Sequence, residues 1–65
     1  MTRTFTTIIG DWHFWQGTQF MASYEPAKEL LAFDGIHDCI NYLYSRHLNV
    51  TGRTLWQEWK IHNAT

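Results

Sequence analysis

The sequence predicts a small α+β fold, in which an antiparallel sheet is covered on one face by one amphipathic helix. Short runs rich in β-branched and aromatic residues are separated by glycines or by the single proline, as in small sheets. One later segment carries apolar residues at helical spacing instead. No linker, repeat or low-complexity segment divides the 65 residues, so we expect a single domain spanning 1–65.

The first half of the chain indicates two strands. Residues 4–9, Thr-Phe-Thr-Thr-Ile-Ile, are β-branched or aromatic throughout and predict the first strand. Gly10-Asp11 is a turn signal. Residues 12–15 fit either a short strand or an aromatic loop. Residues 19–24 alternate, with Phe20, Ala22 and Tyr24 on one side, and predict the second strand.

A turn and a returning strand follow. Pro26 suits the second position of a type I turn over residues 25–28. We interpret residues 29–33 as a third strand, because the next element has its own start signal. The alternative is a short helix that begins at Pro26 and ends before Gly35.

The clearest element is a helix over residues 35–48. Asp34 is a suitable N-cap, and Asp38 lies in the first turn, where negative charge suits the helix dipole. Asn49 is the expected left-handed stop. The apolar stripe comprises Ile36, Cys39, Ile40, Leu43 and Tyr44.

Residues 54–61 are interpreted as the last strand, with a helix as the open alternative. As a strand, the segment places Leu55 and Trp59 on the same face; as a helix, it groups Leu55, Trp56 and Trp59. The segment has the length of a strand, and a single helix needs a sheet to cover.

The candidate contacts come from two tryptophan pairs with the same spacing. The first pair is Trp12 and Trp15, and the second is Trp56 and Trp59. On strands, residues three apart point to opposite faces, so each pair would turn one indole outward, away from the helix. Which indole of each pair is exposed stays open. An exposed aromatic sheet face usually marks an interaction site. The predicted binding residues are Trp12, Trp15, Tyr24, Arg53 and Trp56.

The charge pattern argues against nucleic acid as the main partner. Five basic residues against six acidic ones give a net charge of −1, with no basic run to attract phosphates. A weak single-stranded nucleic-acid binder that stacks bases on an aromatic sheet face remains an alternative.

No constellation predicts catalysis, a metal or a cofactor. The four histidines include no pair at the spacing typical of zinc motifs. Cys39 belongs to the apolar stripe and is expected to be an inert small hydrophobe. Phosphate loops, serine elbows and paired-carboxylate motifs are absent from the sequence. We therefore expect a protein that is not an enzyme.

A cytoplasmic location is expected. A lone cysteine has no partner for an intramolecular disulfide and fits a reducing compartment. No apolar stretch approaches the length of a membrane span, and the N-terminus lacks the apolar core of a signal peptide.

These observations favour a protein-binding module. In size, near-neutral charge and excess of aromatics, the chain resembles the small stand-alone proteins that phages and mobile elements encode to block host machinery. Anti-CRISPR proteins and polymerase inhibitors are of this kind, and the resemblance implies an inhibitor that occludes a host surface. It carries no residue motif, so no site residues come from it. A homodimer that buries the open sheet face is a further alternative.

Overall fold

The computed structural model describes residues 4–64 and confirms the α+β class. A four-stranded antiparallel sheet precedes two helices, not one. The elements are β1 (Thr6–Ile9), β2 (Trp12–Gln16), β3 (Phe20–Tyr24), β4 (Glu29–Phe33), α1 (Ile36–Ser45) and α2 (Asn49–Ala64). The segment that was open between strand and aromatic loop is β2, and the strand predicted at 29–33 is confirmed as β4. The first two predicted strands are shorter, starting at Thr6 and Phe20.

The sheet is a meander in which each strand pairs with its neighbours in sequence. Gly10 opens the β1–β2 turn with a φ of 60°, the backbone conformation that a two-residue hairpin loop needs at its first position. The predicted turn at residues 25–28 is present, closed by a 3.1 Å bond from the Lys28 amide to the Glu25 carbonyl. These tight connections fix the register of the whole sheet.

Helix α1 ends at Ser45, three residues before the predicted end at residue 48. His47 adopts a left-handed φ of 61°, and two hydrogen bonds close the end: the Leu48 amide donates to the Leu43 carbonyl and the His47 amide to the Tyr44 carbonyl. This pair of bonds is the Schellman motif. Asn49 is therefore not the stop but the first residue of α2. Asp34 is not the N-cap either; Gly35 takes that position without a side-chain hydrogen bond.

The prediction of a strand at 54–61 is wrong, because these residues belong to α2. Gly52 and Leu55 are buried, and Trp56, Trp59 and His62 are partly buried on the same side of the helix. This spacing of three and four residues is helical. At Gly52, α2 crosses α1 so closely that a Cβ atom would lie 2.8 Å from the Tyr44 ring. The first helix therefore packs against a second helix as well as the sheet.

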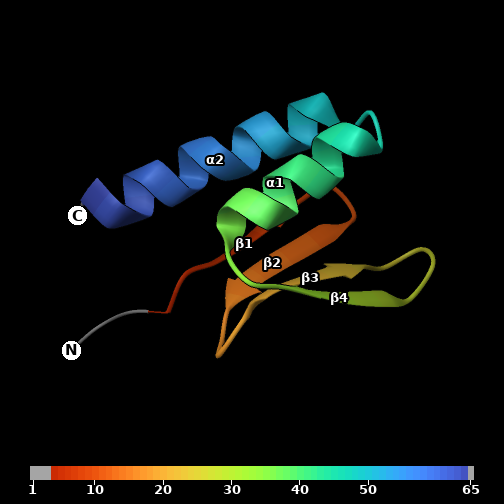
Figure 1. Cartoon of the computed structure of the whole chain (residues 1–65), viewed down its shortest axis with the longest axis horizontal. Helices are drawn as coiled ribbons and strands as arrows, with labels where there is room; N and C mark the ends of the chain where they lie inside the picture. Colours follow the sequence, from red (N-terminus) through yellow and green to blue (C-terminus); the bar gives the residue numbers. More distant parts are fainter. Residues whose placement is uncertain (1–3, 65) are drawn as a thin grey trace.

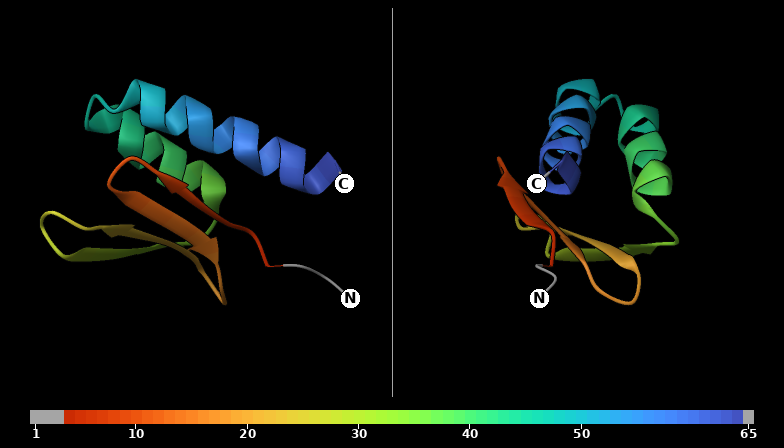
Figure 2. Two further views of the ribbon diagram at one scale, coloured as in Figure 1. Left: turned by 180° about the vertical axis from the view of Figure 1, so that it is seen from behind. Right: turned by 90° about the vertical axis from the view of Figure 1, so that its left-hand side faces the viewer.

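The two helices lie side by side on the same face of the sheet (Figures 1 and 2). Helix α2 packs over β1, whereas α1 packs over β3 and β4. We call this face of the sheet the covered face and the opposite one the open face. Neither helix, within residues 4–64, has the length and apolar character needed to span a membrane.

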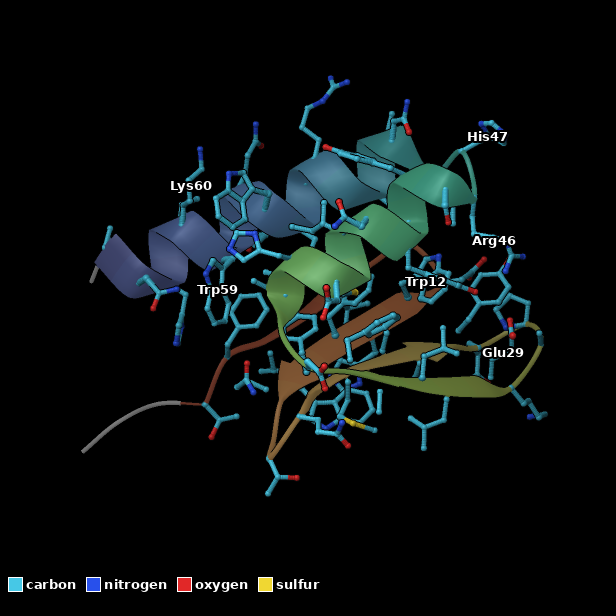
Figure 3. The ribbon with its side chains drawn as sticks, viewed as in Figure 1. Trp12, Glu29, Arg46, His47, Trp59 and Lys60 are labelled. Atoms are coloured by element: carbon cyan, nitrogen blue, oxygen red, sulfur yellow. The ribbon has the colours of Figure 1, made fainter. Side chains whose placement is uncertain are left out.

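Aromatic side chains fill the space beneath the helices. Trp12 stacks on Phe14 with ring centroids 5.6 Å apart, and Phe14 and Phe20 follow at 6.4 Å. Phe5 and Phe20 then meet Trp59 of α2 edge to face, at 5.1 and 6.1 Å. Figure 3 shows Trp12 between the sheet and α1 and Trp59 on the side of α2 toward the sheet. Large aromatics thus stabilise a chain too small for an extensive aliphatic core.

Candidate functional site

The open face is built by strand alternation, which sends every second side chain away from the helices. The antiparallel register places these side chains beside one another: Trp15 lies between Thr6 and Met21, and Ser23 lies between His13 and Leu30. The open face comprises Thr6, Ile8, His13, Trp15, Met21, Ser23, Leu30 and Ala32.

The open face is mainly apolar and carries no acidic residue, lysine or arginine. Ile8 is 75% exposed and Leu30 is 64% exposed, while Trp15 and Met21 are half-buried between their neighbours. The described Asp, Glu, Lys and Arg residues all lie in turns, bends or helices, except Glu29 at the start of β4, whose register places it on the covered face. Solvent-facing sheet surfaces are usually polar, so this face departs from the common pattern.

One polar contact orients the centre of the open face. Thr6 Oγ1 and His13 Nε2 form a 2.8 Å hydrogen bond. The His13 ring in turn lies against the indole of Trp15, with centroids 4.7 Å apart. The Trp15 indole therefore packs against a side chain that is itself hydrogen-bonded, and such a contact restricts the indole and reduces the entropy lost on binding.

The predicted contact residues do not form one surface. Among them, Trp15 lies on the open face, whereas Trp12 is only 7% exposed and packs in the core. Tyr24 lies on the covered face, 4.7 Å from the Trp12 ring. Trp56 and Arg53 belong to α2, on the other side of the sheet.

Of the open-face residues, only Trp15 was among the predicted contacts. Ile8, Met21 and Leu30 were missed, as were Thr6, His13, Ser23 and Ala32, although the alternation within residues 4–9, 19–24 and 29–33 carried the signal. Alternation shows which residues share a face, and only the placement of the helices decides which of the two faces is covered.

The helix layer has different surface chemistry. Trp56 lies against the His37 ring at 5.3 Å and under the Lys60 ammonium at 5.9 Å, so its outer surface is next to charge. Arg53, Tyr44 and Asn49 line an open depression of about 490 Å³. Arg53 is the only charge in this lining, and no acid–base pair accompanies it there.

The groups that could support chemistry are scattered. Residues 4–64 contain no cluster of three or more His, Cys, Asp or Glu side chains that could hold a metal ion. Cys39 is fully buried in the core, and burial raises the pKa of its thiol from 9.0 to about 12. Because the thiolate is the reactive form, Cys39 is a structural residue.

Comparison with known proteins adds no family to these observations. The conclusions that follow therefore depend on the side chains described above. No protein-family model, no curated protein and no solved structure matches this chain.

Proposed function

We propose that this chain binds another protein through the open face of its sheet. The observation that carries the proposal is the combination of Ile8, Leu30 and a Trp15 packed against His13, on a surface without Asp, Glu, Lys or Arg side chains. Depletion of charge together with aromatic and methionine side chains is typical of the centre of a protein interface. The charged turns around the sheet would form the polar rim.

A protein partner fits this face better than a nucleic acid. Phosphate contacts supply much of the affinity of nucleic-acid binders, and they require Lys or Arg beside the stacking aromatics. Arg53 and Lys60 lie on α2, and Figure 3 shows Lys60 pointing away from the sheet. Phe5 and Phe20, which could have stacked on bases, are in the core. Arg3 lies outside the described residues.

Occlusion of a partner's surface is the form of this function that we favour. A face without a catalytic group acts by covering what it binds, as the small phage-encoded inhibitors that the chain resembles in kind do. Trp15 is the expected hot spot, because tryptophan is enriched among the residues that dominate binding energy. The lone Cys39 favours a partner in a reducing compartment such as the cytoplasm.

The proposal is tested with a charge placed on the open face. Ser23 lies on a central strand between His13 and Leu30, so Ser23→Lys adds an ammonium within the proposed interface. We expect the variant to lose at least about tenfold in affinity, because the buried charge would find no partner. Capture from a lysate of cells that encode the protein, quantified by mass spectrometry, identifies the partner; titration of the purified partner then measures affinity.

Gln57→Lys is the matched control, because it adds the same charge at an exposed position of α2. Circular dichroism checks that both variants fold. Equal loss in both variants, or no loss in either, would contradict the proposal. A thymidine oligonucleotide titrated at rising salt tests the nucleic-acid alternative, which requires binding that weakens steeply with salt.

A further inference from the structure

We propose that the outer edge of β4 pairs with the same edge of a second copy, joining two sheets into one. β4 is the last strand of the sheet, and no segment of residues 4–64 lies along its outer side. The inference goes beyond the proposed function and does not depend on it, because edge pairing leaves the open face free.

The outer edge of β4 has few of the usual protections against pairing, because Glu29 at its first residue is the one charged side chain of the strand. Natural edge strands carry lysines, prolines or bulges that prevent another strand from adding to them. After Glu29, β4 continues as Leu-Leu-Ala-Phe, and its five residues pair with β3 without a bulge. A second strand therefore meets an extended, regular edge.

Two-fold symmetry restricts the register of such a pair. Antiparallel neighbours related by a two-fold axis keep the same face of the sheet, so residues that pair must be an even number of positions apart. The register centred on Leu31 is the one that uses all five residues of β4. It places Leu30 opposite Ala32 of the second copy on the open face, and Leu31 opposite its own counterpart on the covered face.

The same register brings opposite charges together at both ends. Lys28 is the last turn residue before β4, with a left-handed φ of 53°, and Asp34 lies in the bend after the strand, so centring on Leu31 brings Lys28 of each copy to the end of the strand pair where Asp34 of the other copy lies. Within one chain, Lys28 has only a 4.0 Å contact with Glu25, between side chains that are 85% and 80% exposed. Such an exposed pair is worth little and leaves Lys28 available.

Among the described residues, the other edge of the sheet offers no such match. In β1 the corresponding registers, centred on Thr7 or Ile8, bring no pair of opposite charges together within residues 4–64. Within the described part of the chain, charge complementarity therefore favours β4 and its Leu31-centred register.

Partly exposed apolar side chains above β4 also favour a second copy as the partner of this edge. Leu31 and Phe33 are half-buried, and Tyr42 of α1 lies against Phe33 with ring centroids 5.6 Å apart. Helix α1 lies above β3 and β4, on the same side of the sheet as Tyr42 and the half-buried Leu31 and Phe33. A second copy would cover the exposed sides of these three residues. One strand pair and these apolar side chains form a small interface, so we expect a dissociation constant between about 1 µM and about 1 mM.

Charge exchange tests the register directly. Because the dimer is symmetric, each single substitution changes both Lys28–Asp34 contacts. Lys28→Asp makes each contact a repulsive pair of carboxylates, and Asp34→Lys makes each contact a repulsive pair of ammonium groups. We expect each variant to weaken the dimer by about tenfold or more, and the double variant Lys28→Asp/Asp34→Lys to restore it. Sedimentation velocity across the expected concentration range measures the dissociation constant. In the wild-type protein, amide chemical shifts that change with concentration should centre on residues 28–34.

Controls with the same change in charge lie on α2: Lys60→Asp matches Lys28→Asp, and Glu58→Lys matches Asp34→Lys. Both should leave the dimer unchanged. A wild-type protein that stays monomeric at about 1 mM overturns the inference. So does a dimer that neither charge exchange weakens, or one that the double variant fails to restore. None of these outcomes bears on capture by the open face, which Ser23→Lys tests separately.

Discussion

The two faces of the sheet are made by alternate residues of the same strands, and yet they meet opposite environments. Phe14 and Phe20 on the covered face are completely buried, whereas Ile8 and Leu30 on the open face are largely exposed. Both faces are predominantly apolar in sequence. The difference shows that apolar character alone does not place a residue in the core; a covering layer must also exist, and here both helices are on one side.

Trp12 and Trp15 show the same contrast between two side chains of a single strand, β2. Trp12 stacks on Phe14 beneath α1, while Trp15 of the same strand lies on the open face against His13. The covered indole contributes to stability through burial and ring contacts. The open indole adds less to stability, and its position suits contact with a partner.

The largest expected difference in stability is between lysine substitutions at Ala22 and at Ser23, which are adjacent residues of β3 on opposite faces of the sheet. Ala22 is 1% exposed on the covered face, so Ala22→Lys would overfill the core and bury an unpaired charge. We expect a loss of at least about 4 kcal/mol, which leaves a domain of this size mostly unfolded. Ser23→Lys, on the open face, should change the free energy of unfolding by less than about 0.5 kcal/mol. Urea unfolding followed by circular dichroism measures both. Similar losses in the two variants would contradict the assignment of the faces.

A smaller contrast is expected within the first tryptophan pair. Trp12→Ala should destabilise the protein by about 3–5 kcal/mol, because it leaves a cavity in the aromatic core. Trp15→Ala removes a half-exposed side chain that leaves no enclosed cavity, and about 1 kcal/mol is expected. Thermal unfolding and tryptophan fluorescence compare the two variants. If Trp15→Ala were the more damaging change, the open face would be part of the structural core.

The smallest expected effect is the change in stability with pH that comes from the buried thiol of Cys39. The pKa of Cys39 is about 12 in the fold against 9.0 for the free thiol, so the folded protein holds a proton that the unfolded chain releases first. Stability from this source is complete below pH 9.0 and is lost as the pH rises toward about 12.

Unfolding free energies at about pH 8 and about pH 10.5 should therefore fall more in the wild type than in Cys39→Ala. The rest of the chain is the same in both proteins, so its contribution to the pH dependence cancels in the difference. A thiol reagent should modify Cys39 slowly in the folded protein at about pH 8. Fast modification, or equal pH dependence in the two proteins, would mean that the core admits solvent at this point.

Several elements could be predicted from local sequence signals. The strand at residues 29–33, the turn at 25–28 and the stripe of the first helix all follow from residue types that favour one backbone conformation. The end of that helix was misplaced because His47, not an asparagine or glycine, takes the left-handed position, where the Schellman bonds and the packing of Leu48 hold it.

The candidate site was harder to predict than the elements. Of the predicted contacts, Trp15 lies on the open face, whereas Trp12 and Tyr24 lie on the covered face and Arg53 and Trp56 lie on α2. Trp56 was placed on the sheet because residues 54–61 were interpreted as a strand, and Trp12 was included because the strand alternation leaves open which indole of a pair faces outward. The alternation in the sequence shows which residues share a face but not which face is covered.

By itself the sequence determined the α+β class, the aromatic nature of the core and a near-neutral net charge of −1, since these follow from composition and local periodicity. The tertiary structure decided the rest. Residues 54–61 have the length of a strand and the periodicity of a helix, and burial of Gly52 and Leu55 beside the first helix favours the helix. With both helices on one face, the other face stays open, because nothing else among the described residues covers it.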